Sequence, residues 1–140
     1  MDETPASRMG RHAAFRNARL LPVLLVAGIC ACAADLERSP VGFNPLPAGA
    51  APGILRLPGE VTLTPSTGYS ETLPAGSAWQ YVGTTPQGEV YRPLGDVFSV
   101  EGANRHEAYL VVAGNRVVGF YLPGERAFAP LPQPVPLPIR

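Results

Sequence analysis

The sequence predicts a mainly β protein, a small antiparallel β-barrel or sandwich of about 5–7 short strands flanked by a signal segment, a Pro/Gly-rich tether and a Pro-rich tail. Between Gly59 and Pro130, short runs rich in β-branched and aromatic residues alternate with turn residues. No stretch of this region keeps the i, i+3, i+4, i+7 apolar spacing of a helix. A Gly114-Asn115 pair also separates two apolar runs, which is typical of a two-residue hairpin loop.

The overall composition limits the chain to one domain with tails and excludes several function classes. Its 140 residues carry 11 basic and 11 acidic side chains, so there is no basic excess to hold a nucleic acid. All the basic residues are arginines, which excludes a P-loop lysine and a lysine nucleophile. The 17 prolines and 15 glycines indicate irregular segments, but a hydrophobic content of 46% is too high for a wholly disordered chain.

Residues 9–34 have the order of a secretory signal peptide. Three arginines precede an uncharged run of 15 residues, 20–34, and this run ends in small residues. The run contains a proline and a glycine, and a membrane-spanning helix needs about 20 apolar residues, so an uncleaved anchor helix is the weaker alternative. We therefore assign residues 1–32 to a signal peptide.

Both cysteines of the chain lie at the exit of this segment, in the tetrapeptide Ile29-Cys30-Ala31-Cys32. This tetrapeptide resembles the lipobox of a bacterial lipoprotein precursor. It has an aliphatic residue, a tolerant position, a small residue and then a cysteine, in that order. The resemblance implies that Cys32 is lipidated, becomes the first mature residue and holds the chain on a membrane with its domain facing the periplasm. By the same resemblance, Ala33 after the cysteine favours the outer membrane.

Cleavage at an Ala-x-Ala site is the alternative, because Ala31-Cys32-Ala33 also fits a signal peptidase site. The product would then be soluble in the periplasm or secreted. In either case no thiol remains after Cys32, so the mature chain has no internal disulfide and depends on its hydrophobic core.

Residues 33–58 predict a flexible tether. Five prolines and three glycines interrupt this segment, so neither a helical nor an alternating apolar pattern survives. The alternative is that Ile54, Leu55 and Leu57 add an edge strand to the folded part.

The folded part, residues 59–129, is divided into strands by its turn residues. The segment Thr85-Pro86-Gln87-Gly88 suits a type I turn, with Pro at the second and Gly at the fourth position. The predicted strands are 60–64, 77–83, 89–92, 96–101, 107–113, 116–122 and 126–129.

The two apolar runs around Gly114-Asn115 form the predicted hairpin, with pairing counted outward from the loop. On this register Phe120 lies on one face with Val111, and Tyr121 lies on the other face with Leu110. Both faces are apolar, so the hairpin is either buried on both sides in a sandwich or curled barrel or exposes one face to a partner. The predicted pairs are Val112 with Val117, Val111 with Val118, Leu110 with Gly119, and Tyr109 with Phe120.

Residues 130–140 predict a stiff Pro-rich tail. Proline occupies every second position from Pro130 to Pro138, which removes alternate backbone donors and favours polyproline II over sheet pairing. The tail then acts as a spacer. The alternative is that it docks on an aromatic groove of a partner or across the protein's own barrel.

An aromatic set provides the candidate binding surface. Trp79 and Tyr81 share one face of a predicted strand, and Tyr91 lies on the next strand and is followed by Arg92. If they are exposed, these side chains form a shallow site for a peptide or a glycan. The alternative is core packing, because a small barrel needs bulky side chains.

His106 is the single histidine after the signal segment, and no cysteine accompanies it. A metal site needs three or four convergent ligands, so we predict no metal and no cofactor. No G-x-S-x-G elbow is present, so we predict no catalytic residue and no enzymatic activity. The charged segment around His106 is then a loop that caps a strand. A small hydrolase that uses His106 with two carboxylates is the remaining alternative.

The sequence therefore predicts an exported, lipid-anchored protein of the bacterial cell envelope that acts as a non-enzymatic binding or assembly accessory. Its partners are the membrane, through Cys32, and an envelope protein or a cell-wall component, but no nucleic acid. The alternative function is a small-ligand or cell-wall binding domain that uses the aromatic face.

Overall fold

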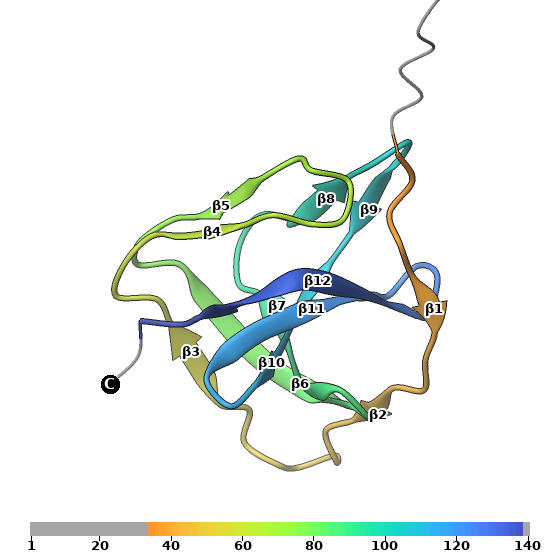
Figure 1. Ribbon diagram of the computed structural model, residues 1–140. Coiled ribbons are helices and arrows are strands. Elements are labelled where there is room, and N and C mark those ends of the chain that lie inside the picture. Colours follow the sequence, from red (N-terminus) through yellow and green to blue (C-terminus); the bar gives the residue numbers. More distant parts are fainter. Residues whose placement is uncertain (1–33, 139–140) are drawn as a thin grey trace, which may run out of the picture. The chain divides into compact units, whose positions relative to one another are not determined.

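The computed structural model describes residues 34–138, which belong to one compact unit and contain strands but no helix (Figure 1). The predicted signal peptide, with its lipobox and Cys32, lies outside the described residues. The strands are β1 (Ser39–Pro40), β2 (Asn44–Pro45), β3 (Ile54–Arg56), β4 (Val61–Leu63), β5 (Glu71–Leu73), β6 (Ala78–Thr85), β7 (Gly88–Pro93), β8 (Ser99–Glu101), β9 (Arg105–Glu107), β10 (Tyr109–Ala113), β11 (Arg116–Leu122) and β12 (Ala127–Pro136).

One eight-stranded antiparallel sheet organises the fold, and the predicted fold class is confirmed. Its strand order is β1-β12-β11-β10-β7-β6-β2, and β3 also pairs with β6. Two small antiparallel sheets, β4–β5 and β8–β9, lie above it in the view of Figure 1. Short turns join β6 to β7, β10 to β11 and β11 to β12, whereas β7 reaches its neighbour β10 through the segment that contains β8 and β9.

Residues 41–43, which we call the strap, join the two edge strands β1 and β2. Because the strap is so short, the sheet has to curl. Strand β1 pairs with β12 and strand β2 pairs with β6, at opposite ends of the strand order. The chain from Pro40 to Asn44 spans at most about 14 Å. Six strand spacings of a flat sheet would measure about 29 Å. The strap can therefore reach both edges only when the sheet is rolled into a half-barrel.

The two faces of the sheet are covered by separate hydrophobic clusters. The larger cluster is mostly aliphatic and includes Phe120, which is fully buried. The smaller cluster consists of Val90, Val111, Tyr121 and Phe128, with partly buried side chains around them. Of the two alternatives for the central hairpin, burial on both faces is the one observed, since its residues belong to both clusters.

The strap covers the smaller cluster. Val41 and Phe43 pack against it, and the Phe43 ring stacks on Tyr121 with centroids 4.9 Å apart and planes 19° apart. Gly83 makes this contact possible, because a Cβ atom at that position would meet the Asn44 carbonyl and come within 2.8 Å of the Phe43 ring. Any side chain at residue 83 would push the strap away from β6.

The β10–β11 hairpin turns at Gly114 and Asn115, whose φ angles of 58° and 61° match a type I′ loop. The predicted pair of Val112 with Val117 is confirmed. The predicted pairs beyond it are wrong by one residue, because β11 bulges at Val118. The observed pairs are Val111 with Gly119, Leu110 with Phe120 and Tyr109 with Tyr121.

The bulge changes which side chains share a face. One extra residue in a strand reverses the alternation after it. Phe120 therefore joins Leu110 in the larger cluster, and Tyr121 joins Val111 in the smaller one, opposite to the predicted assignment.

The prediction of a flexible tether over residues 33–58 is wrong for the part that the structure describes. Leu36 and Leu57 are buried, with 2% and 1% of their surface exposed, and they belong to the larger cluster. Strand β3 confirms the alternative of an edge strand, with Leu55 opposite Trp79. The prolines are tolerated because the segment pairs for only two or three residues at a time, always at sheet edges.

The predicted Pro-rich tail is also part of the sheet, so a domain boundary at residue 130 is wrong. Strand β12 pairs with β11 up to Pro136, and Leu131 and Leu137 are buried. The Leu137 N–H donates to the Asn115 carbonyl at 2.8 Å, so this backbone donor faces the β10–β11 hairpin. Since donors alternate along a strand, the neighbouring proline nitrogen points to the unpaired edge, where no donor is required. The alternative that the tail docks on the protein's own barrel is the one observed.

Candidate functional site

The predicted aromatic surface does not exist as a unit, because Trp79 is buried. Only 2% of its surface is exposed, and it packs edge-on against Phe98 at a centroid distance of 5.5 Å. Its indole Nε1–H donates to the Ser77 hydroxyl at 3.2 Å. Trp79 is therefore a core residue and not part of a surface site, so the alternative of core packing is the one observed.

Tyr81 and Tyr91 lie opposite each other on β6 and β7, with ring centroids 5.7 Å apart. Both are partly buried. Arg92 is separated from them, since adjacent residues of a strand point to opposite faces. Its guanidinium donates to the Gln80 side-chain carbonyl on the exposed face. The structure therefore brings two of the four predicted site residues together.

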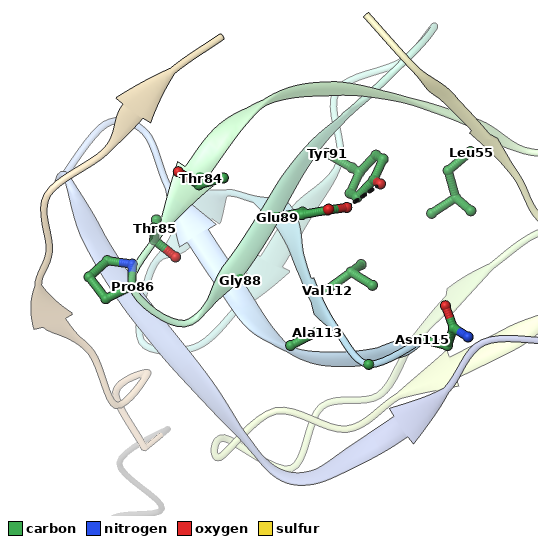
Figure 2. Close-up of a pocket in the computed structure, with 11 residues that line it drawn as sticks. Leu55, Thr84, Thr85, Pro86, Gly88, Glu89, Tyr91, Val112, Ala113 and Asn115 are labelled. Atoms are coloured by element: carbon green, nitrogen blue, oxygen red, sulfur yellow. Dashed lines mark hydrogen bonds between the residues drawn. The ribbon is translucent and has the colours of Figure 1, made fainter.

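A depression of about 450 Å³ is lined by Tyr91 but not by Tyr81, and we call it the turn pocket (Figure 2). The β6–β7 turn and the β10–β11 turn form its walls, and Leu55 of β3 closes one side. Gly88 permits the close approach of the two hairpins, because a Cβ atom there would meet the Val112 carbonyl. The lining residues are Leu55, Thr84, Thr85, Pro86, Gly88, Glu89, Tyr91, Val112, Ala113, Gly114 and Asn115.

Glu89 and Tyr91 form the polar centre of the turn pocket. The Tyr91 hydroxyl donates to Glu89 Oε2 at 2.7 Å, as drawn in Figure 2. Burial raises the pKa of Tyr91 well above its usual range, and the hydrogen bond to Glu89 raises it further. The phenol therefore remains a hydrogen-bond donor at neutral pH and orients the carboxylate.

Thr85 supplies a second polar group to the same wall. Its side chain is 7% exposed, and its hydroxyl oxygen has no hydrogen-bond partner within the described residues. An unsatisfied buried hydroxyl costs about 1–3 kcal/mol. The oxygen itself has almost no accessible surface, so it lies behind the pocket wall and does not face the pocket.

His106 lies in β9 rather than in a loop, and only 5% of its surface is exposed. Its Nδ1 atom is 2.7 Å from Glu125 Oε1, and its Nε2 atom is 3.9 Å from Asp35 Oδ1. The Arg38 guanidinium donates to Asp35 at 3.0 Å, and this hydrogen bond holds the pKa of Asp35 below its usual range. We call His106, Asp35 and Glu125 the histidine clamp, because it connects β9, the N-terminal segment and the β11–β12 turn.

Sequence reasoning named Tyr91 as a site residue and His106 only in the hydrolase alternative, and it missed the residues that surround them. Glu89 was visible as a carboxylate two positions before Tyr91, on the same face of one strand. Asp35 and Glu125 are 71 and 19 residues from His106 in the sequence, so no local pattern connects them. Only the curl of the sheet brings these distant carboxylates to one point.

No family model matches the chain, and no curated protein and no solved structure matches it either. Residues 34–138 contain no helix that is long and apolar enough to cross a membrane. Within the same residues, no three His, Cys, Asp or Glu side chains are grouped so that they would hold a metal ion.

Proposed function

We propose that the chain is an exported, lipid-anchored module of the bacterial cell envelope that works by binding rather than by catalysis. Export and anchoring are supported by the order of the N-terminal sequence: a positively charged segment, then an apolar run, then the lipobox-like Ile29-Cys30-Ala31-Cys32. The turn pocket is the observation that carries the binding role. It is concave, has both apolar and polar walls, and contains the hydrogen-bonded pair of Glu89 and Tyr91.

The early start of the folded part affects how such an anchor would work. Only four residue steps separate Cys32 from the buried Leu36, a distance of at most about 14 Å along the chain. A lipid on Cys32 would therefore hold the β domain close to the membrane surface. The module would act on partners at or near that surface and would not search the periplasm from a long tether.

Membrane fractionation of two cysteine variants tests the anchor. The Cys32→Ser variant is expected to move from the membrane pellet to the soluble fraction, because the acceptor thiol is lost. The matched variant Cys30→Ser is expected to remain in the pellet. If both variants stay in the pellet, lipidation at Cys32 is wrong. If both become soluble, the cysteines act in export and not as a specific anchor.

The small hydrolase remains the second candidate, because His106 and two carboxylates do converge beside a depression lined by Asp35 and Glu125. The Nε2 atom, which would have to take up a proton, is buried and has no hydrogen-bond partner within residues 34–138. This burial favours a structural role for the histidine clamp. A hydrolytic activity that is lost in His106→Gln, while thermal stability is kept, would favour the hydrolase.

A further inference from the structure

The turn pocket has a charge of one sign. Glu89 is the single charged side chain among its eleven lining residues. Arg116, which follows Asn115 in the sequence, is exposed and does not line the pocket. A carboxylate with no cation among the lining residues attracts a positively charged ligand and disfavours an anionic one.

The carboxylate of Glu89 is positioned but not saturated. Its Oε2 atom accepts the Tyr91 hydroxyl, and no hydrogen bond to its Oε1 atom is formed within the described residues. Because the phenol fixes the carboxylate, a ligand donor loses less free energy in ordering it. An ammonium group has three donors and matches this remaining acceptor capacity.

The walls of the pocket are suited to an apolar body attached to that cation. Leu55 and Val112 provide aliphatic surface, and the partly buried Tyr91 ring stands beside Glu89 (Figure 2). Aromatic faces attract ammonium groups through the negative face of the ring.

From charge, geometry and wall chemistry together, we propose that the turn pocket binds a primary ammonium group carried on a small apolar residue, such as the free amino end of a short peptide. Glu89 pairs with the ammonium, Tyr91 orients Glu89, and Leu55 with Val112 contacts the apolar side chain. The inference deepens the proposed binding role and rests on it. The volume of about 450 Å³ lies within the range of ligand pockets, roughly 300–1,000 Å³, and suits a ligand of one or two residues.

Binding of leucinamide to the purified full chain in detergent, measured by calorimetry, tests this site. Leucinamide carries the ammonium group, and N-acetyl-leucinamide is the matched probe that lacks it. We expect the acetylated probe to bind at least about tenfold more weakly, since it cannot form the charged hydrogen bond. Leucinamide binding should also weaken as the salt concentration rises. Equal binding of the two probes, or no binding of leucinamide, overturns the proposal.

Two carboxylate variants separate the site from general charge effects. Glu89→Gln should weaken leucinamide binding about tenfold with little change in thermal stability, because the side chain is exposed and the amide is isosteric. Glu60→Gln removes an equally exposed carboxylate outside the pocket and should leave binding unchanged. Equal effects of the two substitutions overturn the site.

The outcomes also distinguish this inference from the proposed function. Glu89→Gln should still fractionate with membranes, because it leaves Cys32 in place. If leucinamide does not bind while Cys32-dependent attachment to the membrane is observed, only the ligand class is wrong. If the chain is soluble but binds leucinamide, the pocket stands and the anchor is wrong.

Discussion

The two faces of the curled sheet are protected in different ways. The larger cluster is covered by the small sheets β4–β5 and β8–β9, which contribute Val61, Leu63, Leu73 and Val100. The smaller cluster is covered mainly by the strap, through Val41 and Phe43. One face is therefore sealed by four strands, and the other depends on a single short segment of chain.

This difference shows where the stability of the fold lies. Apolar burial contributes roughly 25 cal/mol per Å², so the face with more buried aliphatic surface contributes more to the free energy of unfolding. The strap side instead depends on a few aromatic contacts, such as Phe43 on Tyr121. Opening of the strap should be a local event that leaves the larger cluster intact.

The largest effect is expected from Phe120→Ala in the larger cluster. This ring is fully buried and lies 6.0 Å from the Phe98 ring. Its loss should reduce the free energy of unfolding by about 3–5 kcal/mol, measured by urea denaturation. Val97→Ala is the control, because Val97 is 71% exposed and should change stability by less than about 0.5 kcal/mol. A Phe120→Ala effect as small as that of the control contradicts the proposed distribution of stability.

A smaller effect is expected from Phe43→Ala on the strap. The ring is only partly buried, so its removal should cost about 1–2 kcal/mol. Hydrogen exchange should accelerate at the Leu46 amide, which donates to Val82, before it accelerates in β10. Ile54→Ala removes a half-exposed apolar side chain elsewhere and serves as the control. If the amides of β10 exchange as early as Leu46, the strap is not an independent unit.

The smallest effect is expected from Glu71→Gln on β5, at the rim of the larger cluster. Burial raises the pKa of Glu71 above its ordinary value of 4.5, and the nearby Glu101 raises it further. Stability is then lost as pH rises from 4.5 through the raised pKa, because ionisation is disfavoured in the folded chain. The variant should remove this loss and gain less than about 1 kcal/mol at pH 7, since the group remains partly solvated. Thermal melting against pH measures it, and an unchanged profile would contradict the assignment.

The fold class could be predicted because its signals are local. Gly114 and Asn115 adopt the positive φ angles that a two-residue hairpin loop requires, and the flanking runs alternate as strands do. The bulge at Val118 could not be predicted, because it depends on β12. A Cβ atom on Gly119 would lie 2.5 Å from the Ala129 carbonyl, so packing against that strand fixes the register.

The proline-rich segments were misinterpreted for a different reason. Proline prevents sheet pairing only where its missing donor faces the partner strand, and the sequence does not say which side that is. In the same way, Tyr91 was recognisable as a site residue, but Leu55 and Asn115 reach the turn pocket from strands far apart in the sequence. Local patterns predicted individual side chains, whereas the curl of the sheet determined which of them meet.

The position of the histidine clamp also determines how the domain would respond to force. If the chain is held at Cys32, tension enters the fold at Asp35 and passes to His106 and Glu125 before it reaches β1. Strand β1 has only two pairs with β12, so it would unzip one pair at a time under a pulling load. Because Leu36 lies between Asp35 and β1 and belongs to the larger cluster, the histidine clamp and the packing of Leu36 would have to give way before the load reached the strap.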